Sequence, residues 1–237
     1  MDPAAREADL ARDGRRLIDL CVADLERDVP PCPGWQTRDL LAHVAGAWTA
    51  FAVFTEAAST EAPDFSRLDS APEDDDGLVA FAEAARDRII AAVAAADPAT
   101  PVWTWWGERT LAFYQRRAHL ETVVHRLDAQ AAAGDPTPVD PVVAADGVDE
   151  FYGEIMTNPP TLPAGTFHMH QTDGDGEFML SVEDGRIVVA HEHGKGDAAL
   201  RASGHELLEV VWGRRPLDGL EVFGDAAVAA AWTSLAP

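Results

Sequence analysis

The segment Ala118-His-Leu-Glu-Thr-Val-Val-His-Arg-Leu-Asp128 decides what the first half of the chain is expected to build. In a helix, Glu121 and His125 are four residues apart, so their side chains project from the same face. A carboxylate and an imidazole directed at one point are two of the three protein ligands of a catalytic zinc site. The third ligand has to come from elsewhere in the chain, and His43 is the best candidate. The segment therefore predicts a metal site among helices, provided that these three side chains meet.

Apolar residues recur at helical spacing in several segments of this half, and breaks rich in Pro, Gly or acidic residues separate them. Helices are expected at residues 4–27, 38–55, 77–96 and 108–133, with a shorter one at 142–155. Thr37 is expected to cap the second helix, with Asp39 in its first turn. Four main helices with short connections predict a four-helix bundle, which we assign to residues 1–157.

The pattern changes after Asn158-Pro-Pro-Thr-Leu-Pro163, a composition typical of a linker. Apolar and polar residues then alternate, which indicates β-strands, and Gly-containing turns separate the first three of them. The expected strands lie at 166–170, 178–182, 187–191, 200–203 and 220–223. Helices are expected from Gly204 and after Asp225, which would cap the last one. Residues 164–237 should therefore form a small α+β domain.

Three tryptophans, Trp103, Trp105 and Trp106, stand close together before the fourth helix. They either form a hydrophobic plug at the end of the bundle, or one indole lines the mouth of a pocket. The plug is the simpler explanation, and both alternatives stay open at this point.

Composition limits the classes of partner. The 237 residues are 47% hydrophobic, which is ample for a folded core, and the formal net charge is −23. Nucleic acids and anionic membranes need a basic surface, so neither is an expected partner. Lys195 is the only lysine among the basic residues, and with abundant Ala, Asp and Gly this usage is typical of a high-GC bacterial genome.

The two cysteines, Cys21 and Cys32, are best explained as reduced thiols in a chain of this length. The charged N-terminus has no apolar stretch behind it, and no apolar run reaches the roughly 18 residues of a membrane span. We therefore expect a soluble, cytoplasmic protein.

Zinc suits two imidazoles and one carboxylate, and it also binds thiolate readily. However, a Glu-x-x-x-His spacing is common by chance, and it then forms an ordinary exposed pair on a helix. The spacing alone leaves both alternatives open.

Three motifs resemble the mycothiol-dependent maleylpyruvate isomerase family. Cys32-Pro-Gly-Trp-Gln-Thr-Arg-Asp-Leu-Leu-Ala-His43 is similar to the signature that opens its second helix. Glu121-Thr-Val-Val-His-Arg-Leu-Asp128, followed by Ala144-Ala-Asp-Gly-Val-Asp-Glu150, resembles its second signature. The segments Trp212-Gly-Arg-Arg-Pro-Leu-Asp218 and Val222-Phe-Gly-Asp225 are similar to its C-terminal domain. The resemblance thus touches both expected domains.

The resemblance implies a DinB-like bundle followed by a domain similar to sterol carrier proteins. It also implies that His43, Glu121 and His125 bind the metal, with mycothiol as the thiol cosubstrate. Zinc would lower the pKa of this thiol, and the thiolate would then attack an electrophile. The expected function is therefore cis–trans isomerisation of a maleylpyruvate-like unsaturated oxo-acid, or transfer of the thiol to a small-molecule electrophile. The alternative is a non-catalytic module that binds a metal or a thiol and regulates or sequesters it.

Arg214 and Arg215 match the family segment that supplies an arginine to an acidic substrate, and a guanidinium binds a carboxylate in a fork geometry. We assign them as catalytic candidates, although arginines at this position can also cap the preceding helix.

Other candidates are weaker. Cys32 lies in a proline-rich turn, where packing is the simpler role. The pairs His168/His170 and His191/His193 are expected on neighbouring strands, with each pair on one face. They are either solvent-facing histidines, which is the preferred explanation, or a second metal site.

Overall fold

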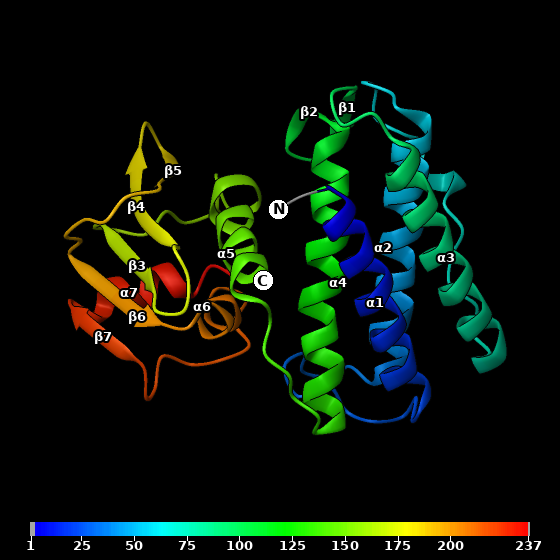
Figure 1. Ribbon diagram of the computed structural model, residues 1–237, viewed down its shortest axis with the longest axis horizontal. Coiled ribbons are helices and arrows are strands. Elements are labelled where there is room, and N and C mark those ends of the chain that lie inside the picture. Colours follow the sequence, from blue (N-terminus) through cyan, green and yellow to red (C-terminus); the bar gives the residue numbers. More distant parts are fainter. Residues whose placement is uncertain (1–2, 237) are drawn as a thin grey trace. The chain divides into compact units, whose positions relative to one another are not determined.

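The computed structural model describes residues 3–236 (Figure 1). The chain divides between Thr137 and Pro138 into two units, and each unit has its own hydrophobic core. This division lies ahead of helix α5 (Pro141–Glu150), whereas the sequence placed it after residue 157. The reason is packing: α5 lies against α6 (Gly204–Val211), and Val148 of α5 belongs to the second core. We therefore treat α5 as part of the second unit.

Four long helices form the first unit and pack side by side (Figure 1). They are α1 (Pro3–Val22), α2 (Thr37–Ala57), α3 (Asp75–Ala95) and α4 (Leu111–Ala133), with a short 3-10 helix, η1 (Phe65–Arg67), between α2 and α3. Each long helix confirms one expected from the apolar periodicity. Trp48 of α2 is fully buried, and its indole Nε1 donates a hydrogen bond of 2.8 Å to Thr122 Oγ1 of α4. This hydrogen bond links the two helices that carry the candidate ligands.

The start of α2 differs from the expectation in one detail. Gln36 is the N-cap, and Thr37 is the first helical residue. The Asp39 carboxylate accepts the Gln36 backbone N–H at 2.8 Å, while the Thr37 hydroxyl donates to the Asp24 carbonyl. Thr37 is buried and used for a tertiary contact, so it cannot also cap the helix. By length and composition α2 could cross a membrane, but 61% of its most apolar window is buried, as in a core helix.

A β-hairpin precedes α4 where the sequence predicted the first turn of a helix. Strands β1 (Pro101–Thr104) and β2 (Gly107–Thr110) pair in antiparallel fashion, and the turn uses Gly107 at φ +97°. Aromatic and β-branched residues favour this extended conformation. Trp103 and Trp105 pack against Phe54 and Phe65, as expected for a hydrophobic plug. Trp103 and Phe54 also line a small pocket of about 130 Å³, so the two alternatives for the tryptophans do not exclude each other.

A five-stranded sheet with helices on one face forms most of the second unit (Figure 1). The strands are β3 (Phe167–Gln171), β4 (Glu177–Glu183), β5 (Arg186–Ala190), β6 (Ala198–Ala202) and β7 (Glu221–Gly224), in the order β5-β4-β3-β6-β7. Only the β3–β6 pair is parallel. The chain enters this unit through α5 and the π-helical turn η2 (Phe151–Ile155) and ends in α7 (Ala226–Thr233). The expected α+β domain is confirmed.

Alternation along β3 separates core residues from candidate site residues. Phe167 and Met169 are fully buried in the second core, together with Trp232 of α7. His168 and His170 occupy the alternate positions and therefore project from the opposite face of the sheet.

Candidate metal centre

Helices α2 and α4 bring His43, Glu121 and His125 together. Glu121 Oε1 lies 3.2 Å from His43 Nε2 and 3.2 Å from His125 Nε2. The His43 side chain is 43% exposed, whereas those of Glu121 and His125 are 12% and 10% exposed. The site thus has a buried carboxylate and an imidazole that solvent can reach.

Asp128 fixes the orientation of His125. Its Oδ2 lies 2.8 Å from His125 Nδ1, and its side chain is fully buried. Because an ionised carboxylate can only accept, Nδ1 carries a proton, and this contact orients the ring so that Nε2 faces Glu121. The Cys32 thiol lies 3.5 Å from the same Oδ2, so Cys32 contributes to this second layer. A carboxylate behind a histidine is the usual support for a metal ligand.

Arg117 supports Glu121 from within the same helix. Its guanidinium donates to Glu121 Oε2, and both residues are largely excluded from solvent. Burial raises the pKa of Glu121, but the charges of Arg117 and His125 outweigh it and hold that pKa well below its usual range. Burial lowers the pKa of His125, and the charge of Glu121 with the hydrogen bond to Asp128 raises it to about 9. Glu121 is therefore ionised at neutral pH.

Sequence reasoning named the three candidate ligands but gave no role to Asp128 or Arg117. The available signal was their spacing on one helix face, because Asp128 follows His125 by three residues and Arg117 precedes Glu121 by four.

The donor set fits an ion of the zinc class. Two imidazole nitrogens and a carboxylate oxygen are ligands that zinc accepts, whereas magnesium and calcium prefer oxygen alone. Tetrahedral bonds of about 2.0–2.1 Å place neighbouring ligand atoms roughly 3.3 Å apart. Both carboxylate–imidazole separations, at 3.2 Å, are close to that spacing.

Arg214 and Arg215 follow α6 in the second unit, and they contact residues of that helix and its C-cap residue, Trp212. Arg214 Nη1 donates to the Trp212 carbonyl at 2.6 Å, and Arg215 Nη1 lies 3.2 Å from Glu206 Oε1 and 3.7 Å from Glu209 Oε2. These contacts agree with a role at the C-terminal end of the helix. Binding of an acidic substrate by either arginine remains a prediction.

The four histidines of the second unit are arranged differently from the expectation. β5 borders β4 and not β3, so the two pairs do not lie on neighbouring strands, and His191 and His193 follow the end of β5. His191 Nε2 lies 3.0 Å from Asp149 Oδ1, whereas His193 joins His168 and His170 around Glu177. The spacing in the sequence could not reveal the strand order, and Glu177 was missed because the spacing does not fix the register of the β3–β4 pair.

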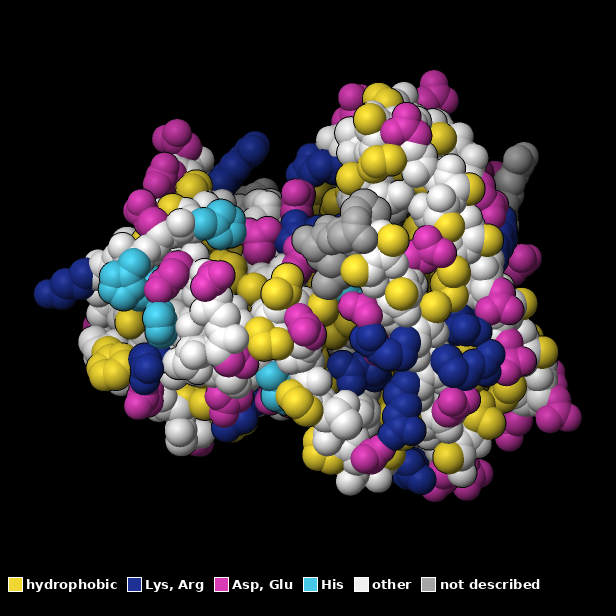
Figure 2. All heavy atoms as spheres, viewed as in Figure 1, with side chains coloured by type: hydrophobic (Ala, Val, Ile, Leu, Met, Phe, Trp, Pro, Cys, Tyr) yellow, Lys and Arg dark blue, Asp and Glu magenta, His cyan; other side chains and the backbone are white. Residues whose placement is uncertain are grey.

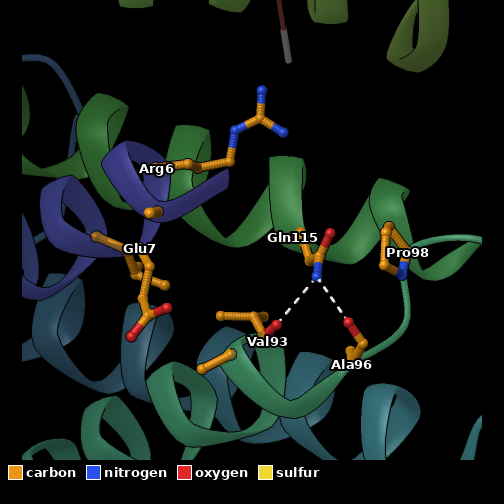
Figure 3. A pocket seen from close by; sticks show the side chains of 9 residues that line it. Arg6, Glu7, Val93, Ala96, Pro98 and Gln115 are labelled. Atoms are coloured by element: carbon orange, nitrogen blue, oxygen red, sulfur yellow. Dashed lines mark hydrogen bonds between the residues drawn. The ribbon is translucent and has the colours of Figure 1, made fainter. Parts of the chain in front are cut away.

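A separate pocket of about 290 Å³ lies between α1, the end of α3 and the start of α4 (Figure 3). Gln115 Nε2 donates to the carbonyls of Val93 and Ala96 at 3.0 and 3.3 Å, which caps the end of α3 (Figure 3). Arg6 and Glu7 also line the pocket. None of the candidate ligands does, so this pocket is distinct from the metal centre.

Comparison with known proteins agrees with both units. Residues 7–130 match the mycothiol maleylpyruvate isomerase N-terminal domain, and residues 142–231 match the MDMPI C-terminal domain. Crystal structures of the mycothiol-dependent maleylpyruvate isomerase and of a point mutant share the fold, with TM-scores of 0.65 and 0.66. Each is 16% identical and covers 100% of this chain and 97% of its own. A search of curated proteins gave no match. The chain therefore belongs to the mycothiol maleylpyruvate isomerase family.

Proposed function

We propose that this protein is a zinc-dependent enzyme that adds mycothiol to an electrophilic substrate and isomerises a maleylpyruvate-like unsaturated oxo-acid. The observation that carries the proposal is the equal separation of 3.2 Å between Glu121 Oε1 and the Nε2 atoms of His43 and His125. The family match and the activity named for the two solved structures support the same choice of reaction and thiol.

His43, Glu121 and His125 would hold the ion. When bound, zinc supplies a Lewis acid that lowers the pKa of a thiol at its remaining position. Asp128 keeps the proton of His125 on Nδ1, so that Nε2 is available, and Arg117 keeps Glu121 ionised. The exposed edge of His43 leaves one side of the site open to solvent, from which small molecules can enter.

The chemistry proposed for the substrate is addition followed by elimination. The thiolate sulfur bonds to a carbon of the cis double bond, and the π electrons move into the conjugated carbonyl as an enolate. The former double bond is now single and can rotate. The enolate then re-forms the double bond in the trans geometry and expels the thiolate, so mycothiol is not consumed. Arg214 or Arg215 is proposed to bind a substrate carboxylate during these steps.

The test is metal analysis of the purified full-length protein, followed by a mycothiol-dependent assay with maleylpyruvate. His43→Ala, Glu121→Ala and His125→Ala should each remove the bundle metal and the activity, whereas the exposed-histidine control His191→Ala should keep both. Arg214→Lys and Arg215→Lys should raise KM for an acidic substrate and keep the metal if the fork geometry binds the carboxylate.

Two results would decide against the proposal. A wild-type protein whose bundle binds no metal at neutral pH contradicts the central assignment. Metal binding without any mycothiol adduct, either with maleylpyruvate or with a generic electrophile, favours the non-catalytic binding module. If an adduct forms but no trans product is released, the protein is a thiol transferase. We further propose the cytoplasm as its compartment.

A further inference from the structure

A second cluster of histidines surrounds one carboxylate in the sheet of the second unit, and it shares no residue with the bundle site. His168 and His170 lie on β3, Glu177 begins β4, and His193 lies in the segment between β5 and β6. Histidine side chains are visible on the exposed face of this unit (Figure 2). His168, Glu177 and His193 bring three donor atoms within 4.8 Å of one another.

Each imidazole directs a ring nitrogen at the Glu177 carboxylate. His168 Nε2 lies 2.6 Å from Oε2, while His170 Nδ1 and His193 Nδ1 lie 2.7 and 3.3 Å from Oε1. The rings of His168 and His193 meet edge to face with centroids 4.9 Å apart. Nitrogen atoms from three different positions in the chain therefore converge on one carboxylate.

Strand pairing and a close backbone approach create this convergence. His170 lies directly opposite Glu177 in the antiparallel β3–β4 pair, and His168 is its diagonal neighbour. Gly194, next to His193, lies close to Met179 of β4, where an added Cβ would come within 3.3 Å of the sulfur. Although His168 is on the face without helices, its side chain is only 5% exposed. The cluster is thus a hydrogen-bonded group centred on Glu177 and not a set of free surface histidines.

We propose that His168, Glu177 and His193 form a second site for a divalent metal of the zinc class. Imidazole nitrogens favour zinc and neighbouring transition metals over magnesium and calcium, which require oxygen. His170, which shares Glu177 Oε1 with His193, is the positioning residue that orients the carboxylate. The ion would link β3 and β4 to the segment that carries His193, and so order one face of the second unit.

The test uses the full-length chain with His43→Ala and His125→Ala, in which the bundle ligands are removed. Titration with Zn²⁺ should give one bound ion per chain, and titration with Co²⁺ should give the visible absorption of a nitrogen-rich site. Adding His193→Ala or Glu177→Gln should abolish this binding. His170→Ala should weaken it by about 10–100-fold, as for other supporting residues.

His191→Ala is the matched control. His191 is exposed, lies two residues before His193 and pairs with Asp149, so its loss should leave metal binding unchanged. His193 is 76% exposed, so His193→Ala should keep the fold, which circular dichroism will check.

Failure of the His43→Ala/His125→Ala chain to bind Zn²⁺ overturns the proposal, as does binding that both His193→Ala and Glu177→Gln leave unchanged. In either case the cluster is a hydrogen-bonded group only. Because no residue is shared, neither result bears on the proposed function of the bundle site.

Discussion

The bundle and the sheet each place histidines around one glutamate, but they hold that glutamate in different ways. Glu121 is 12% exposed, receives a guanidinium from Arg117 on the same helix, and faces a histidine backed by Asp128. Glu177 is 25% exposed, and histidines are the partners described for both of its oxygens. The bundle site is therefore oriented by charged groups behind the ligands, whereas the sheet site depends on the histidines themselves.

The two sites also differ in how closely their side chains already match the arrangement around a bound ion. In the bundle, both imidazoles already lie 3.2 Å from one oxygen, close to the spacing of ligands around zinc. In the sheet, His168 lies at 2.6 Å, so its side chain and that of Glu177 must separate before an ion can enter. We therefore expect tighter metal binding in the bundle than in the sheet.

The largest expected effect is on stability, and it should differ between the two glutamates. Glu121→Ala leaves Arg117 buried without this carboxylate, and loss of one partner of a buried ion pair costs about 3–5 kcal/mol. Glu177→Ala acts at a partly exposed position, where an ion pair contributes about 1 kcal/mol or less. Chemical denaturation of the metal-free proteins measures both changes in the free energy of unfolding. Equal losses for the two variants would show that the contrast in burial does not control stability.

The same contrast explains how far the sequence predicted these sites. Glu121 and His125 are on one helix, where a spacing of four residues fixes a shared face, and the apolar pattern of residues 38–55 places His43 on a second helix. Those local rules place the three residues on two helices, whereas the resemblance to the isomerase family is what joined them as a candidate ligand set. Glu177 was missed because its partners depend on the register of the β3–β4 pair and on the path of the segment that carries His193, and the spacing of the histidines gives neither.

Local rules also gave most elements of both units, but they placed the start of the fourth helix too early. Residues 108–110 were expected in its first turn, whereas they pair with β1, whose valine, tryptophan and threonine residues favour an extended conformation. The assignment of α5 failed for a different reason, because periodicity shows that a helix is amphipathic but not which core its apolar face joins.

The reactivity of the two cysteines should differ between the metal site and the core of the bundle. Cys32 lies beside Asp128, whereas Cys21 is fully buried, and burial raises the pKa of the Cys21 thiol to about 12. At pH 8 its thiolate fraction is then about three orders of magnitude below that of an ordinary cysteine. We expect iodoacetamide to label Cys32 and not Cys21 in the folded protein.

Peptide mass spectrometry reads this labelling, and both cysteines should react once the chain is unfolded in denaturant. Labelled protein should also retain less bundle metal, because the adduct lies against Asp128. Similar labelling of both cysteines in the folded state would contradict the burial of Cys21.

Removing the negative charge that contacts His125 should lower the metal affinity of the bundle site. Asp128→Asn keeps the size of the side chain but loses the anion that holds Nδ1–H, and loss of such a partner lowers metal affinity by about 10–100-fold. Competition with a chelator measures the affinity. A reduction similar to that for His170→Ala in the sheet would show that both supporting residues act in the same way, and no reduction would exclude Asp128 from positioning His125.

The smallest effect should come from an exposed carboxylate in the same unit as Glu121. Glu56 receives two hydrogen bonds from Arg88, at 2.9 and 2.6 Å, but both side chains are exposed. Such pairs contribute about 0.2–1 kcal/mol, so Glu56→Gln should lower the free energy of unfolding by no more than this at pH 7. The hydrogen bond from Arg88 lowers the pKa of Glu56, so its contribution is present above the unfolded value and is lost as the pH falls through the lowered folded pKa. Denaturation at neutral and acidic pH measures the change. A loss as large as that of Glu121→Ala would mean that an ion pair in this bundle stabilises equally whether it is buried or exposed.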